Sequence, residues 1–262
     1  MLFVATMLFL VFAFLAYMEV APFIRDIRQR AALVPIEDGA ELFANAFGRY
    51  PPSDANDMTG LPYCGAMKLV EALVGQDLQG FHPKSGFRAD GLDPTTLVPL
   101  YTPDTLGVRH RAFPPAQNAY IFKLVDVFGK GNTGPFRDDI LVICDIFERR
   151  RPSGKKTGMP VLYYRANPSG TRHDPNNPND PNNIYDYRDN LALLNLGIPG
   201  DPDATHSLAD PKRFYLNTRN DRIRETSRPY RADSYILISA GRDGLYGTAD
   251  DICNFEWKYR ER

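Results

Sequence analysis

The chain has 262 residues, of which 43% are hydrophobic, and this is enough to bury one sizeable core. Its 31 basic and 32 acidic residues nearly cancel, so the charge balance argues against a nucleic-acid-binding protein and predicts no nucleic-acid partner. With 22 prolines and 20 glycines clustered between apolar runs, the chain favours short elements joined by shaped loops over a long helical bundle.

The N-terminal segment, residues 1–18, has only apolar side chains apart from Thr6. At ~1.5 Å per helical residue this segment would extend roughly 27 Å, which is close to the hydrocarbon thickness of a bilayer. We therefore predict a transmembrane helix within residues 1–24. A cleaved signal peptide is the alternative, but no basic leader precedes the apolar run, and Glu19-Val20-Ala21-Pro22 is a poor cleavage site.

The residues that follow this segment bear on its orientation. Arg25, Arg28 and Arg30 come directly after it, and no charged side chain precedes it. By the positive-inside rule, this asymmetry predicts a cytoplasmic body.

Two helices are predicted next. Ile36, Ala40, Phe43 and Phe47 recur at helical spacing, so we expect an amphipathic continuation of the first helix over residues 25–48, bent by Pro22 and Pro35 and ending at Gly48. Residues 66–74 predict a second, short helix that ends at Gly75.

Runs rich in β-branched and aromatic residues predict four strands, at residues 119–128, 140–147, 160–165 and 234–239. The basic run 149–151, with Lys155 and Lys156 after it, is interpreted as a solvated loop. Residues 174–183 are too polar to pack, and the stretch from 81 to 231 is expected to hold a large loop-rich insertion with little regular structure in its later part.

Catalytic signatures are missing from the sequence. There is no G-x-S-x-G or H-E-x-x-H motif, and the G-x-G-x-x-G match at residues 129–134 does not open a helix that could hold a pyrophosphate. We therefore expect no enzymatic activity. Cys64, Cys144 and Cys253 are too few for a disulfide scaffold, so they form either one disulfide with a free thiol or three buried thiols.

The strongest chemical signal is the acidic, glycine-rich loop at residues 239–255. Asp243, Asp250 and Asp251 lie close together in the sequence, and the carbonyls of Leu245, Tyr246 or Gly247 could join them. Calcium takes six to eight oxygen ligands, so this set predicts a calcium site. The alternative is an ordinary Asp-Gly turn in which Asp250 or Asp251 binds backbone amides.

In order along the chain, these segments resemble a type II secretion major pseudopilin of the protein G type, within the type IV pilin-like class. The resemblance lies in the N-terminal helix, AFGRYPPSD, KLVEALVG, PVLYYRANPSG and YILISAGRDGLYGTADDICNFEW. The final block follows the family pattern S-x-G-x-D-G-x-x-G-T-x-D-D-I-x-N-W, with Phe255 in place of Trp. Ala5 departs from the family, whose members carry a glutamate at that position.

The resemblance implies that the terminal loop binds calcium through Asp243, Asp250 and Asp251, with the carbonyls of Leu245 and Tyr246 as further ligands. It also implies a single-pass inner-membrane protein with a periplasmic body, which conflicts with the orientation that the arginines predict. Its partners would be copies of itself, other pseudopilins and the inner-membrane assembly proteins of the secretion system.

We therefore expect an α+β, pilin-like fold, in which a long N-terminal helix packs on a small antiparallel sheet. Residues 1–24 would form the membrane part of that helix, 25–48 its amphipathic continuation and 49–262 the globular domain. The expected function is that of a structural subunit of a secretion filament. The alternative is a membrane-tethered extracytoplasmic binding protein or enzyme with its site in the 81–231 insertion.

Overall fold

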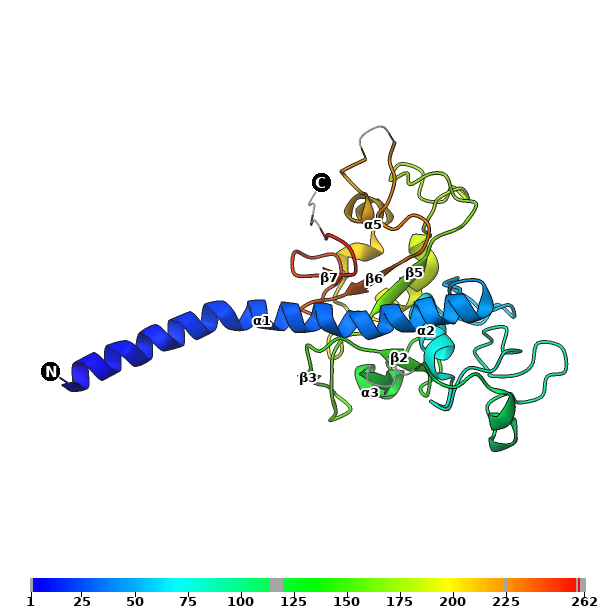
Figure 1. Ribbon diagram of the computed structural model, residues 1–262, viewed down its shortest axis with the longest axis horizontal. Coiled ribbons are helices and arrows are strands. Elements are labelled where there is room, and N and C mark those ends of the chain that lie inside the picture. Colours follow the sequence, from blue (N-terminus) through cyan, green and yellow to red (C-terminus); the bar gives the residue numbers. More distant parts are fainter. Residues whose placement is uncertain (1, 114–119, 224–225, 258, 260–262) are drawn as a thin grey trace.

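The computed structural model describes residues 2–113, 120–223, 226–257 and 259, with side chains from residue 20 onward. It is a mixed α+β fold, as expected. One long helix, α1 (Leu2–Phe47), sets its longest dimension, and the N-terminal half of α1 projects away from the body while the C-terminal half lies across it (Figure 1).

The packed half of α1 is held by one stripe of buried side chains at helical spacing: Gln29, Leu33, Ile36, Ala40 and Phe43. The helix ends where Gly48 adopts a positive φ of 72°. The predicted amphipathic continuation and its end at Gly48 are therefore confirmed, and both prolines lie inside one continuous helix.

Of the predicted transmembrane segment, residues 1–24, the side chains of residues 1–19 lie outside the described ones. Within the described part of the chain, no helix combines the length and the apolar character needed to cross a membrane.

The second helix, α2 (Gly65–Val74), lies beneath α1, and all of its residues are buried. It ends at Gly75, which has a positive φ of 79°, so this prediction is confirmed. A Cβ at Gly65 would lie 2.2 Å from the Tyr163 carbonyl oxygen, so only glycine lets the helix start this close to the neighbouring strand.

The main sheet is antiparallel, with strand order β5 (Leu162–Arg165), β6 (Tyr235–Ser239), β7 (Ile252–Cys253). Tyr163 pairs with Leu237, and Ile238 pairs with Cys253. All five residues of β6 are buried, and this strand lies at the centre of the sheet, between β5 and β7. The strands predicted at 160–165 and 234–239 are confirmed.

Two smaller antiparallel pairs complete the strands. β1 (Ile121–Lys123) pairs with β2 (Leu141–Ile143), and β3 (Arg149–Arg150) pairs with β4 (Lys156–Thr157). The basic run is therefore a hairpin rather than a fully solvated loop. Its third arginine, Arg151, is buried and donates from Nε to the Thr157 carbonyl oxygen at 2.9 Å.

The single strand predicted at residues 119–128 is wrong over its second half. The strand ends at Lys123, and Leu124–Phe128 forms the short helix α3. Leu124, Val127 and Phe128 are the buried residues of α3, and their spacing is helical. The Asp126 carboxylate accepts a hydrogen bond from the Lys123 backbone N–H at 3.4 Å, which favours a helix start at this point.

The expectation of little regular structure before residue 231 is also wrong in part. Within residues 81–231, the early part contains the short helix η1 (Pro103–Val108). The later part contains η3 (Tyr187–Asn190), α4 (Leu191–Leu194), η4 (Ser207–Ala209) and α5 (Pro211–Thr218). Tyr185, Phe214 and Tyr215 are buried in the same core as the main sheet. The later part of the expected insertion is thus integral to the body.

Candidate functional site

The terminal loop, residues 240–251, joins the central strand β6 to β7. Gly241 and Gly247 both have positive φ, at 66° and 87°. A Cβ at Gly241 would lie 2.2 Å from the Asp250 carbonyl oxygen, and a Cβ at Gly247 would lie 2.6 Å from the Leu208 nitrogen. The two glycines therefore allow the loop to fold tightly on itself and on its neighbour.

The three predicted carboxylates all accept hydrogen bonds from backbone N–H groups of this loop. Asp250 Oδ2 accepts from Arg242 at 2.6 Å and from Asp243 at 3.0 Å. Asp243 Oδ1 accepts from Leu245 at 2.7 Å, and Asp251 Oδ2 accepts from Gly247 at 2.7 Å. The side chains are therefore arranged as in the alternative prediction, an Asp-Gly turn whose carboxylates bind backbone amides.

Thr248 adds a hydroxyl at the centre of the loop. Its Oγ1 donates to Asp250 Oδ1 at 2.7 Å and lies 3.2 Å from the Leu245 carbonyl oxygen. The other predicted carbonyl ligand, that of Tyr246, accepts from the Leu208 N–H at 3.2 Å. Both carbonyls therefore already have a partner within the protein.

The electrostatics of the loop follow from burial and from the closeness of like charges. Burial first, and then the negative charge of Asp250, raises the pKa of Asp243. Burial also opposes ionisation of Asp250, but hydrogen bonds from Thr248 and from the Asp243 N–H outweigh it and lower the pKa of Asp250. Burial raises the pKa of Asp251 well above its usual range.

These residues form a set of hard oxygen donors in which two carboxylates repel each other, and such chemistry suits a divalent cation of the calcium type. As the side chains lie, however, no group of three or more His, Cys, Asp or Glu residues in the described ranges is placed to hold a metal. The structure brings Asp243 and Asp250 together and directs Asp251 to the amides of Gly247 and Thr248.

Part of the expected insertion supports the terminal loop. The Tyr246 N–H lies 3.2 Å from His206 Nδ1, and Ser207 Oγ donates to the Gly247 carbonyl oxygen at 2.8 Å. His206 is buried, and burial lowers its pKa, which favours the neutral ring that can accept this hydrogen bond. Sequence reasoning missed His206 and Ser207, because nothing near them in the chain points to residue 246.

The terminal segment, residues 239–255, which includes the terminal loop and β7, also contacts α1 at two points. Asn254 Nδ2 donates to Glu37 Oε1 at 3.0 Å, and Arg242 Nε lies 3.6 Å from Asp26 Oδ1. The two acidic residues of α1 are eleven positions apart, or roughly 16 Å along a helix. The terminal segment therefore spans the part of α1 that emerges from the body (Figure 1).

Comparison with known proteins finds no matching family model, no matching curated protein and no matching solved structure. No family is therefore shown for the chain.

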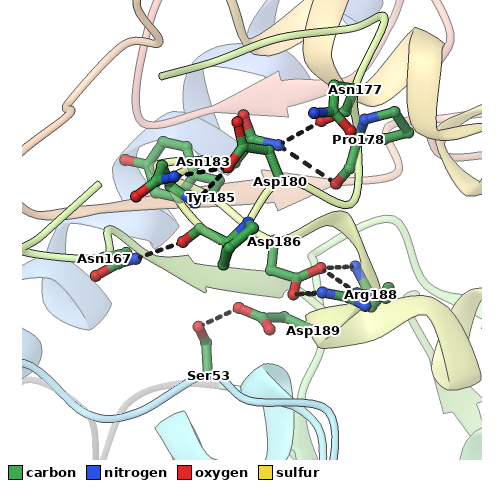
Figure 2. A network of polar contacts seen from close by, with 12 residues as sticks. Ser53, Asn167, Asn177, Pro178, Asp180, Asn183, Tyr185, Asp186, Arg188 and Asp189 are labelled. Carbon is green, nitrogen blue, oxygen red and sulfur yellow. Dashed lines mark hydrogen bonds and ion pairs between the residues drawn. The ribbon is translucent and has the colours of Figure 1, made fainter. Parts of the chain in front are cut away.

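A second feature is an acidic hollow of about 350 Å³ between β5 and the polar loop 174–183, lined by Ser53, Asp180, Asp186 and Asp189 among others. Figure 2 shows its polar side chains converging from several segments. Asp189 is buried and accepts from Ser53 Oγ, and burial raises its pKa well above the usual range. The carboxylate of Asp186 is bound to Arg188, with Nη2 at 2.6 Å from Oδ2 (Figure 2).

The polar loop packs through its amides. Asn183 is buried, and its Nδ2 donates to the Asn177 carbonyl oxygen at 3.0 Å (Figure 2). The expectation that this loop is too polar to pack is wrong at Asn183, because hydrogen bonds satisfy its amide in the interior.

A second hollow, of about 260 Å³, lies beside α2 and is lined in part by Glu71. Glu71 is buried and accepts from the hydroxyls of Ser85, Tyr63 and Tyr101 and from the Gln76 amide. Burial raises the pKa of Glu71, and the four donors oppose this effect. Sequence reasoning missed this cluster because Glu71 falls on the predicted short helix, where a charged residue is usually solvent-facing.

Proposed function

We propose that the protein is a structural subunit of a pseudopilus-like filament of a type II secretion, or type IV pilus-related, system. One observation carries this proposal: the N-terminal half of α1 projects away from the body (Figure 1). Where the helix leaves the body, Val20, Phe23, Ile24 and Ile27 are 50%, 65%, 42% and 50% exposed. Exposed apolar side chains on one continuous helix favour a partner surface, either lipid or other copies of the same helix.

The mechanism is assembly. We propose that the apolar N-terminal part of α1 is held in the inner membrane before assembly, with the body in the periplasm. It then bundles with the helices of neighbouring subunits, including other pseudopilins, when assembly proteins extract it. Burial of apolar surface at about 25 cal/mol per Å² would offset the loss of lipid contacts. The bodies would form the outer layer of the filament.

Cross-linking between introduced cysteines tests this proposal. In the full chain expressed in cells, Ile24→Cys and Ile27→Cys should give oxidative dimers, because the exposed positions on α1 face neighbouring helices. Leu97→Cys, which is 58% exposed on the body, is the matched control and should give far fewer dimers. The native cysteines are all buried, so they should contribute no background. Monomers alone at both helix positions, in protein that is folded, would contradict a bundled helix.

We further propose that the terminal loop binds calcium through Asp243, Asp250 and Asp251, with the Leu245 and Tyr246 carbonyls as additional ligands. The support is the oxygen-only donor set and the repulsion between Asp243 and Asp250, which a cation would relieve. Bound calcium would hold the loop in one shape, and the loop contacts α1 through Arg242, while Asn254, just after β7, adds a second contact.

Removal of calcium provides the test. At a calcium concentration about 100-fold above Kd, binding would add about 2.7 kcal/mol to the free energy of unfolding, so a chelator should lower Tm by several degrees. Asp243→Asn should abolish this difference, whereas Asp203→Asn, in an exposed turn outside the loop, should preserve it. An unchanged Tm after chelation in the unsubstituted protein would contradict the calcium proposal and leave the filament proposal intact.

The second candidate is a membrane-tethered binding protein or enzyme, and the two hollows lined partly by residues 81–231 favour it. Deletion of residues 81–231 cannot test this candidate function, because it would remove Tyr185, Phe214 and Tyr215 from the core and unfold the protein. Substituting a half-buried lining residue such as Asp186 with asparagine, which can also cap η3, disturbs the fold less. A binding protein would lose its ligand on Asp186→Asn, whereas a filament subunit would assemble unchanged.

A further inference from the structure

A broad hollow of about 780 Å³ lies beside α1 at the point where the helix leaves the body. Its lining combines arginines with aromatic and aliphatic side chains: Arg25, Arg28, Ala32, Tyr120, Ile146, Phe147, Glu148, Arg149 and Arg242. The composition differs from that of the other two hollows, which contain more acidic than basic side chains.

The four arginines come from three segments far apart in the chain. Arg25 and Arg28 lie on α1, Arg149 on β3 and Arg242 in the terminal loop, and all four are exposed. Arg149 donates to the Arg242 carbonyl oxygen, so β3 and the terminal loop are in direct contact here. The fold has therefore gathered into one face positive charge that is dispersed in the sequence.

Few negative charges balance this face. Asp26 lies 3.6 Å from Arg242, and Glu148 is the acidic residue of the lining. Among the described side chains, no carboxylate forms an ion pair with Arg25, Arg28 or Arg149. Exposed guanidinium groups without a carboxylate partner are suited to phosphate, which they can bind in a bidentate manner.

The position along α1 indicates where such phosphates would be. Arg25 follows the apolar run 1–18 by seven residues, which is roughly 10 Å along a helix. Between them lie the exposed apolar side chains of Val20, Phe23 and Ile24. Apolar and aromatic side chains followed by arginines are the arrangement found at the level of lipid headgroups.

We propose that this arginine face docks the body against an anionic phospholipid surface, with the four guanidinium groups binding lipid phosphates and Tyr120 and Phe147 lying at the interface. The proposal rests on the membrane-anchored helix of the proposed function and adds a second membrane contact to it. Docking does not depend on which side of the membrane holds the body. It fixes the orientation of the body before assembly, because Arg149 contacts Arg242, and Arg242 in turn contacts Asp26, so that β3, the terminal loop and α1 share one surface.

The experiment uses the full chain in lipid bilayers and a nitroxide label on Tyr120→Cys, a position that lines the hollow and is 43% exposed. One set of bilayers is phosphatidylcholine alone, and the other also contains phosphatidylglycerol. Protection of the label from a water-soluble relaxation agent reports docking, and co-sedimentation with vesicles reports anchoring. We expect protection in the anionic bilayers only, and its loss at high salt.

Neutralising the helix arginines provides the decisive comparison. Arg25→Gln with Arg28→Gln should weaken docking by about tenfold or more, since each basic residue near an anionic surface contributes about a fivefold effect. Lys84→Gln with Arg111→Gln is the matched control. Both of these residues are exposed. They follow Phe81 and His110 closely in the sequence, and the rings of Phe81 and His110 contact that of Phe47, at the C-terminal end of α1. That end of α1 is roughly 30 Å from Arg25, so docking should not change.

The outcomes separate this inference from the proposed function. Co-sedimentation with both lipids, but with the label equally exposed in each, overturns lipid docking and leaves the anchor intact. Equal loss of protection in the test and control variants also overturns docking by these arginines. Failure to co-sediment with either lipid overturns both docking and the membrane anchor.

Discussion

Asn254 and Glu37 are 217 positions apart in the sequence, yet Asn254 Nδ2 donates to Glu37 Oε1 at 3.0 Å. The same asparagine accepts, through Oδ1, a hydrogen bond from the Leu237 N–H at 2.9 Å. One side chain thus joins the terminal segment, the central strand β6 and the long helix α1. This amide therefore ties the terminal segment to both β6 and α1.

Replacing Asn254 with alanine should destabilise the protein by about 2 kcal/mol, because the buried Leu237 N–H loses its acceptor as well as the contact to Glu37. Glu37→Gln should cost less, since its side-chain oxygen can still accept from Asn254. Urea unfolding of Asn254→Ala, of Glu37→Ala, which removes the acceptor, and of the double variant gives the coupling between the two residues. Fully additive losses would show that the contact across 217 positions adds no stability.

Gly241 should be far less tolerant of alanine than Gly154. Both have positive φ, at 66° and 83°. A Cβ at Gly241 would lie 2.2 Å from the Asp250 carbonyl oxygen, whereas a Cβ at Gly154 would meet nothing within 4 Å. Gly154→Ala should therefore cost about 1 kcal/mol of backbone strain, and Gly241→Ala several times that. Similar losses in thermal unfolding would contradict the close approach of the two ends of the loop.

Asp145 should make the stability of the protein depend on pH. Burial raises the pKa of Asp145 to about 7, although its carboxylate accepts from Ser239 Oγ at 3.0 Å and from the Met159 N–H at 3.1 Å. The unfolded chain releases this proton near pH 4, so the folded state becomes less stable as the pH rises from about 4 to 7.

Asp145→Asn keeps the shape of the side chain but removes this titration. Relative to the unsubstituted protein, the variant should gain about 3 kcal/mol between pH 4 and pH 7. The difference between the two proteins is the quantity to measure, because buried His173, with a pKa lowered to about 3, gives an opposite slope in both. A difference that stays constant across this range would show that Asp145 does not titrate there.

The three cysteines should not react with a thiol reagent in the folded protein. Cys64, Cys144 and Cys253 are free and buried, and burial raises the pKa of Cys64 to about 12, which suppresses the reactive thiolate. Unfolding in denaturant without a reductant should expose all three thiols. If only one thiol reacted under these conditions, the other two cysteines would form a disulfide, which is the other arrangement that the sequence allows.

Local patterns determined several elements correctly. The end of α1 at Gly48, the helix α2 and the strands β5 and β6 were all predictable. In each case the apolar residues follow one period and a glycine or a polar turn ends the run. Such preferences act between residues a few positions apart, so they can be read from the chain without knowledge of its neighbours.

Prediction from local sequence failed where a segment fits both the strand pattern and the helix pattern. Residues 124–128 are β-branched and aromatic in composition, but Leu124, Val127 and Phe128 bury one helical face. The capping contact of Asp126 and packing against the core favour the helix at this point. Composition alone did not distinguish the two.

Within the candidate site, the sequence by itself determined that Asp243, Asp250 and Asp251 share one glycine-rich loop. Only the tertiary structure decided that these carboxylates bind backbone amides, that His206 and Ser207 support the loop, and that Arg242 meets Arg25, Arg28 and Arg149 on one face. The reason is physical: these contacts join segments separated by tens to hundreds of residues, and their geometry depends on how helices and strands pack around a shared core rather than on any preference of the residues themselves.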